Sequence, residues 1–130
     1  MVTTQSEINL KRAESYYSAM LSKRFDEMAS YLHQDVHFIG PLAVMHGKEA
    51  VVAAAKNLSQ LLEDIQIRSR FGTANQIMFA YDFLFPAPIG LLRAAVRMEF
   101  TDHLISTIEL FYDGRPFVER RHEIFEDKAE

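Results

Sequence analysis

The sequence predicts an α+β domain in which helices come first and hairpin-connected strands follow. Up to about residue 62 the apolar residues repeat at the spacing of helical turns. From Ile65 onward they alternate with polar residues, as they do along a strand with one buried face. A run of helices followed by sequential strands is typical of α+β domains, in which the helices cover one face of an antiparallel sheet.

Three helices are expected in the first half of the chain. Thr4 and Glu7 have the spacing of a capping box, which satisfies the free amides at the start of a helix. Apolar residues then recur at helical spacing over about residues 5–22, again over 25–32, and a third time over 51–62. These three segments would form the helical layer.

Five strands are expected. The first is short and stops at Pro41, and the loop 86–90 interrupts the later ones because its two prolines lack amide donors. The expected strands cover about residues 36–40, 65–71, 77–85, 92–100 and 105–112.

The length of 130 residues is that of one domain, so we expect residues 1–130 to form a single unit, with a charged, peripheral tail over about 119–130. The net charge of −4 and the lack of a long basic block argue against a nucleic-acid partner. No apolar run is long enough for a membrane span or a secretory signal, and there is no cysteine. A cytoplasmic location without membrane contact is the expectation.

Four segments together resemble the nuclear-transport-factor-2-like superfamily and, within it, the SnoaL-like polyketide cyclases and the ketosteroid isomerases. They are YYSAMLSKRFDEMASYL, DVHFIGP with HGKEAV, ANQIMFAYDFLF, and ISTIELFYDG. The resemblance implies a cone-shaped fold, with three N-terminal helices packed on a strongly curved, mostly antiparallel sheet that encloses an apolar pocket. It also implies that the opposite sheet face often forms a dimer contact.

The ketosteroid isomerases use an Asp base and an oxyanion hole made of a Tyr and a protonated Asp. Carried over by this resemblance, the Tyr falls on Tyr16, the base on Gly40 and the protonated Asp near Val96. Gly40 has no side chain to accept a proton, and Val96 has no hydrogen-bond donor. The resemblance therefore keeps one role of three, and the isomerase reaction would need another base.

Because strand side chains alternate between faces, the same comparison assigns an inner face to each strand. That face is aromatic and aliphatic, with tyrosine hydroxyls as its main polar groups, and such a wall suits a small apolar or aromatic ligand. The expected ligand-binding residues are Tyr16, Phe38, Tyr81, Phe83, Phe85, Met98, Ile108, Leu110 and Tyr112.

The outer face would collect the charged residues of the strands, where opposite charges can pair between neighbours. Its mixture of charge and apolar side chains also suits a homodimer interface. The residues expected there are Arg68, Arg70, Asp82, Arg93, Arg97, Glu99 and Glu109, beside Met78, Ala80, Leu84, Ile105 and Phe111.

Three functions remain open. The first is a SnoaL-like protein that binds a small hydrophobic molecule without turnover. The second is an isomerase, cyclase or hydratase with a rearranged acid or base, in which Tyr16 donates a hydrogen bond and His37, Asp82 or Glu109 moves the proton. The third is a non-catalytic dimerisation or accessory module with a filled interior.

No metal or other cofactor is expected. His33 and His37 are four residues apart, with Asp35 between them, but they fall where the second helix gives way to a strand and should diverge. No recognised metal-ligand motif is present in the sequence.

Overall fold

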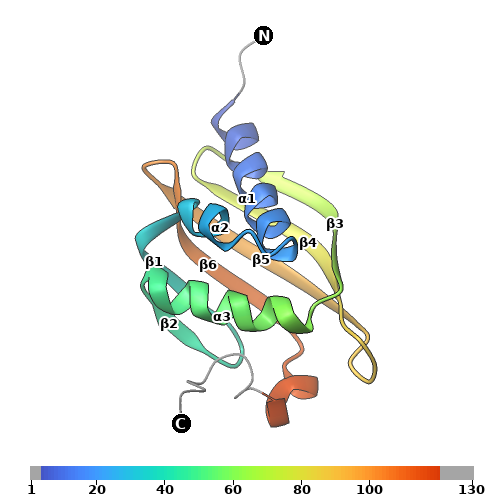
Figure 1. Ribbon diagram of the computed structural model, residues 1–130. Helices are drawn as coiled ribbons and strands as arrows, with labels where there is room; N and C mark the ends of the chain where they lie inside the picture. The colour runs from blue at the N-terminus through green and yellow to red at the C-terminus, as the bar shows by residue number, and fades with distance from the viewer. Residues whose placement is uncertain (1–3, 121–130) are drawn as a thin grey trace.

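The computed structural model describes residues 4–120, which form three α-helices, six strands and one short 3₁₀-helix (Figure 1). The helices are α1 (Gln5–Leu21), α2 (Phe25–Ser30) and α3 (Lys48–Leu61). The strands are β1 (Leu32–Ile39), β2 (Val44–His46), β3 (Asp64–Gly72), β4 (Gln76–Leu84), β5 (Leu91–Thr101) and β6 (Leu104–Tyr112), and the 3₁₀-helix η1 (Arg115–Arg120) follows. Most of the predicted tail, residues 121–130, lies outside the described residues.

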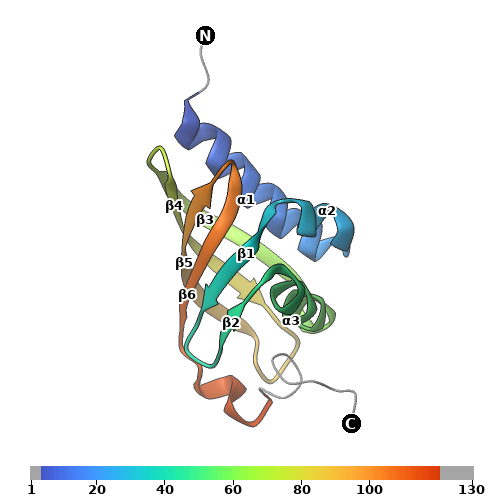
Figure 2. The same ribbon diagram turned by 90° about the vertical axis from the view of Figure 1, so that its left-hand side faces the viewer.

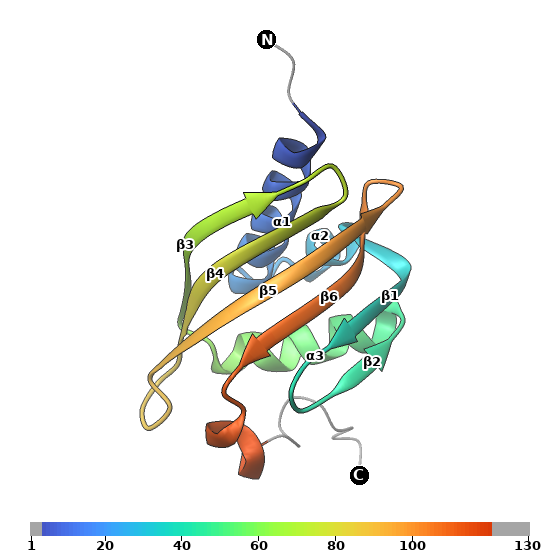
Figure 3. The same ribbon diagram turned by 180° about the vertical axis from the view of Figure 1, so that it is seen from behind.

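All six strands belong to one sheet, in the order β2-β1-β6-β5-β4-β3. β1 and β6 pair in parallel, whereas the other neighbours pair antiparallel. Figures 2 and 3 show the sheet curving around the side on which α1, α2 and α3 lie. The α+β class and the predicted packing of three helices on a curved, mostly antiparallel sheet are confirmed.

Local sequence features position the helices as predicted. The Thr4 hydroxyl accepts a hydrogen bond from the Glu7 amide at 3.2 Å and so caps α1. Gly47 precedes α3 with a φ of 95°, a backbone conformation that favours glycine because other residues have a Cβ. The chain therefore turns sharply from β2 into the helix that covers the lower half of the sheet in Figure 1.

The strand boundaries differ from the prediction at the start of the sheet. β1 begins at Leu32, four residues earlier than expected, so His33 and His37 both lie on this strand. β2 was not predicted, because its three residues are too few to show a periodicity. It forms by pairing with β1, which places Met45 opposite Phe38.

Two irregularities overturn the predicted side-chain directions of Arg70 and Ile105. The pairing of β3 with β4 shifts between Ile67 and Ser69, so that Arg70 lies opposite the buried Phe79 and Phe71 lies opposite the exposed Met78. Arg70 is therefore on the inner face, where it pairs with Glu14 of α1, and not on the outer face as predicted. One extra residue in a strand reverses the alternation beyond it.

The second irregularity lies between β5 and β6. Glu99 pairs with Thr107, but the next residue, Phe100, pairs with Ile105, so Ser106 is the extra residue. Ile105 is consequently fully buried beside Phe100 on the inner face, and its predicted place on the outer face is wrong.

Elsewhere the alternation holds and the inner face forms the core. The aromatic residues of β4 are buried beneath α1, and the apolar residues of β5 and β6 extend this core across the sheet. The largest fully buried side chains of the sheet include Ile77, Phe79, Tyr81, Met98, Ile105 and Ile108.

A pair of matched substitutions tests this arrangement. Phe79→Ala should lower the free energy of unfolding by about 3–5 kcal/mol, because it leaves a cavity in the core. Phe71→Ala should change it by less than about 1 kcal/mol, because 67% of Phe71 is exposed. Urea denaturation of both variants makes the comparison, and a large loss at Phe71 would contradict the shift in the β3 pairing.

Candidate functional site

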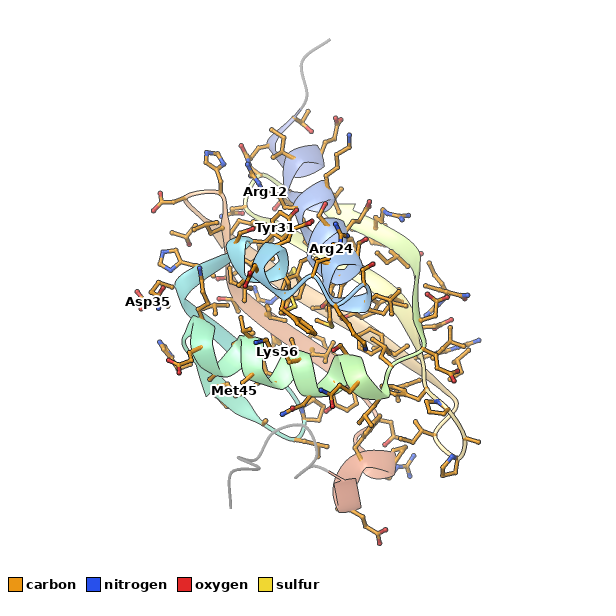
Figure 4. The ribbon with its side chains drawn as sticks, in the orientation of Figure 1. Arg12, Arg24, Tyr31, Asp35, Met45 and Lys56 are labelled. Atoms are coloured by element: carbon orange, nitrogen blue, oxygen red, sulfur yellow. The ribbon has the colours of Figure 1, made fainter. Side chains whose placement is uncertain are left out.

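An apolar cavity of about 70 Å³ lies between the inner face of the sheet and the helices α1 and α3. Every strand except β3 contributes to its wall, Met45 (labelled in Figure 4) reaches it from β2, and Phe117 of η1 completes it. The lining residues are Tyr16, Tyr17, Met20, Phe38, Met45, Val51, Ala54, Ala55, Leu58, Phe83, Phe85, Leu92, Ala94, Ile108, Leu110, Tyr112 and Phe117.

Seven of the nine residues predicted to bind a ligand lie in this wall, and two do not. Tyr81 is fully buried next to the cavity, and its hydroxyl is hydrogen-bonded to that of Tyr17 at 2.7 Å. Met98 is fully buried and pairs across the sheet with Ile108. The seven in the wall are Tyr16, Phe38, Phe83, Phe85, Ile108, Leu110 and Tyr112.

The part of the wall that α3 contributes was not predicted from the sequence. Val51, Ala54, Ala55 and Leu58 belong to the apolar repeat predicted over residues 51–62, but no ligand-binding role was predicted for them. The signal that could have found them is the pair of alanines on that face. Small side chains on a helix that covers a sheet leave space between the two layers.

The polar groups of the wall are tyrosine hydroxyls. One hydrogen bond joins the hydroxyl of Tyr17 to that of Tyr81 behind the wall, whereas the hydroxyl of Tyr16 forms no hydrogen bond with any residue in 4–120. Burial raises the pKa of Tyr16, Tyr17 and Tyr81 above the ordinary tyrosine value of 10.0, and burial also raises that of Tyr112. All four are therefore neutral hydrogen-bond donors at physiological pH.

The acidic residues considered as bases lie on the outer face. Asp82 is buried there, with one carboxylate oxygen 3.0 Å from Nε of Arg68 and 4.0 Å from Nε of Arg93. Glu109 accepts a hydrogen bond from Nε of Arg97 at 2.9 Å. Side chains that point away from the cavity and pair with arginine are placed for stabilising the sheet rather than for proton transfer to a molecule on the inner face.

The structure also shows where the three positions carried over from the ketosteroid isomerases lie. Gly40 lies in the turn between β1 and β2, and a Cβ there would come within 3.0 Å of the Phe38 ring. A carboxylate side chain at position 40 would therefore require Phe38 to move. Val96 is fully buried in the core, and Tyr16 alone of the three lines the cavity.

His33, His37 and His46 lie on β1 and β2, at one edge of the sheet. His37 lies on the outer face, opposite His46 of β2, and so does not reach the cavity. The Nδ1 atom of His33 accepts a hydrogen bond from the amide of Asp35, whose side chain is at the periphery of the molecule (Figure 4). Within residues 4–120, no three His, Asp or Glu side chains gather closely enough to hold a metal ion.

A curved mixed sheet, three helices over its inner face and an apolar cavity between them define a nuclear-transport-factor-2-like protein. The sequence profile of the SnoaL-like domain matches residues 13–115, and the chain belongs to this family. The predicted resemblance is thus confirmed. None of the helices in residues 4–120 is long and apolar enough to cross a membrane.

Solved structures share the fold. A protein from Kribbella flavida is 24% identical with a TM-score of 0.79, and the alignment covers 86% of this chain and 92% of that one. A nuclear-transport-factor-2-like protein of unknown function from Cytophaga hutchinsonii is 15% identical, with a TM-score of 0.73 and coverage of 90% and 96%. Another Kribbella flavida protein, described provisionally as a ketosteroid isomerase, is 16% identical, with a TM-score of 0.73 and coverage of 86% and 82%. No curated protein matches the chain.

The buried tyrosines predict how stability depends on alkaline pH. The unfolded chain loses the Tyr16 proton near pH 10, whereas the folded chain keeps it to higher pH, so the folded state is progressively disfavoured above pH 10. Each such tyrosine should lower the free energy of unfolding by about 1.4 kcal/mol per pH unit there. In Tyr16→Phe the free energy of unfolding, measured by urea titrations, should fall less steeply with pH than in wild type, by about that amount between pH 10.5 and 11.5. Identical slopes would contradict the burial of this hydroxyl.

Proposed function

We propose that this SnoaL-like domain binds a small, largely apolar or aromatic molecule in the cavity between the helices and the inner face of the sheet. The observation that carries the proposal is Tyr16, a residue of the cavity wall whose hydroxyl has no hydrogen-bond partner in residues 4–120. A single buried donor in an apolar wall can orient a ligand carbonyl or hydroxyl. Tyr112 offers a second hydroxyl at the half-buried end of β6.

The size of the cavity restricts the ligand. Pockets for drug-sized molecules are commonly on the order of 300–1,000 Å³, and the cavity here is about 70 Å³. The proposed ligand is therefore much smaller than a steroid and has the size of a single ring or a short chain. Tyr81 and Met98 would act behind the wall, through Tyr17 and Ile108 respectively.

The second candidate is an enzyme of the isomerase, cyclase or hydratase type. It is supported by the fold shared with a protein described provisionally as a ketosteroid isomerase, and by Tyr16, which could donate to a developing oxyanion. Such a reaction also needs a base. The acids proposed for that role, Asp82 and Glu109, pair with arginines on the outer face, and His37 faces the same side. The geometry therefore favours binding over turnover.

We further propose that the outer face of the sheet forms a homodimer. Large apolar side chains are exposed along this face on five of the six strands, at the rim of an ion-pair network that Arg97 forms with Glu99 and Glu109. An apolar surface interspersed with charges is suited to pairing with a second copy of itself. The exposed apolar residues are Val44, Phe71, Met78, Leu91 and Phe111. An accessory module that only dimerises would share this surface, so the ligand experiment is needed to separate the two functions.

Two probes that differ by one carbonyl group test the ligand proposal. Tyr16→Phe should weaken the binding of 2-cyclohexen-1-one about 3- to 10-fold, because one hydrogen bond is lost. It should leave the binding of cyclohexene unchanged. Ligand titrations followed by NMR would measure both affinities.

The control for this experiment changes the space in the cavity. Ala94 lines the cavity, whereas its neighbour Ala95 points to the outer face. Ala94→Leu should abolish binding of both probes and Ala95→Leu should not. Wild-type affinity in Ala94→Leu, or failure of the wild type to bind either probe, would contradict the proposed site.

The dimer proposal has its own test. Phe111→Glu introduces a charge into the exposed apolar surface and should convert a dimer into a monomer. Val118→Glu is the control, because Val118 is exposed on η1 and lies outside the sheet. Analytical ultracentrifugation of both variants gives the mass, and a monomeric wild type would reject the proposal.

A further inference from the structure

A pair of histidines faces solvent at the edge of the sheet, away from the cavity. His37 of β1 and His46 of β2 are directly opposite each other, and their ring centroids are 5.2 Å apart with an angle of 39° between the ring planes. Both side chains lie on the outer face. His46 is exposed and His37 is half-buried.

The backbone holds these two side chains close together. The amide of Gly47 donates a hydrogen bond to the carbonyl of Val36 at 2.7 Å, so the residues next to the two histidines are joined by a backbone hydrogen bond. This pattern makes His37 and His46 a non-hydrogen-bonded antiparallel pair, the type in which opposing side chains are nearest to each other. Their proximity is therefore imposed by the β1–β2 hairpin.

The spacing of the rings fits coordination of one metal ion. Histidine binds zinc through a ring nitrogen at about 2.0–2.1 Å, so two imidazoles on one tetrahedral ion have ring centroids about 5 Å apart. The 5.2 Å separation of His37 and His46 agrees with this distance. Rotation of each ring about its bond to Cβ selects which nitrogen faces the ion.

The ring nitrogens of the pair are also available. Neither imidazole forms a hydrogen bond with another residue of 4–120, in contrast to His33, whose Nδ1 accepts from the Asp35 amide at 3.0 Å. No acidic side chain in that part of the chain completes a three-ligand group. Water would fill the remaining positions, and imidazole ligands favour zinc, nickel and copper over magnesium or calcium.

We propose that His37 and His46 form a two-histidine site for one divalent transition-metal ion, such as Zn²⁺ or Ni²⁺. The site lies on the face of the sheet opposite the cavity. It is independent of the proposed ligand-binding function and has a different test.

Calorimetric titration of the tag-free full chain with ZnCl₂, and separately with NiCl₂, tests the site. Wild type should bind one ion per chain, and the melting temperature should rise with metal concentration because the ion binds the folded hairpin. His46→Gln should weaken binding at least about tenfold, since one ligand then replaces a chelating pair. His37→Gln should have the same effect.

His33→Gln is the matched control. It removes a histidine of the same strand whose Nδ1 atom already accepts a hydrogen bond from the Asp35 amide. It should bind metal like wild type. Wild-type affinity in His46→Gln, equal losses in all three variants, or one ion per two chains would overturn the proposal. Because His46 is exposed, its variant should fold, and its melting temperature without metal confirms this before titration.

Discussion

The alternation of side chains along the four long strands is the constraint on which the rest of this molecule depends. A residue of a strand can serve one face only, so the same segments supply both an aromatic interior and a charged exterior. Along β4 the interior receives Phe79, Tyr81 and Phe83, while Asp82 lies between them on the other side. A carboxylate buried in a strand is tolerated there because Arg68 and Arg93 approach it across the sheet.

The helical layer completes the interior without filling it. α1 contributes tyrosines, and α3 contributes alanines at the positions that face the sheet. The hydroxyls of Tyr17 and Tyr81 are hydrogen-bonded to each other, whereas that of Tyr16 has no hydrogen-bond partner in residues 4–120. The cavity wall is therefore apolar except for a few tyrosine hydroxyls. Such polar groups contribute more to the orientation of a bound ligand than to its affinity.

The fold was largely predictable from the sequence, because the spacing of apolar residues along the chain differs between helices and strands. Arg70 and Ile105 were assigned to the wrong face because one extra residue in a strand leaves the local pattern intact while reversing the pairing beyond it. The wall of the cavity was predictable where it is made by strands. Whether a tyrosine hydroxyl there is free or paired depends on its distance to a residue far along the chain, as for Tyr17 and Tyr81, and no local pattern carries that information.

The shift in β3 has one more consequence. β3 ends the sheet, so its outward-facing amides and carbonyls could recruit strands from other molecules. The irregularity after Ile67 interrupts the regular ladder, and arginines at 68 and 70 place positive charge on both faces of this strand. Such interruptions and charges are the means by which natural sheets resist uncontrolled edge-to-edge growth into aggregates. The extra residue in β3 thus lies at the edge of the sheet, where it opposes regular pairing with a strand of another molecule.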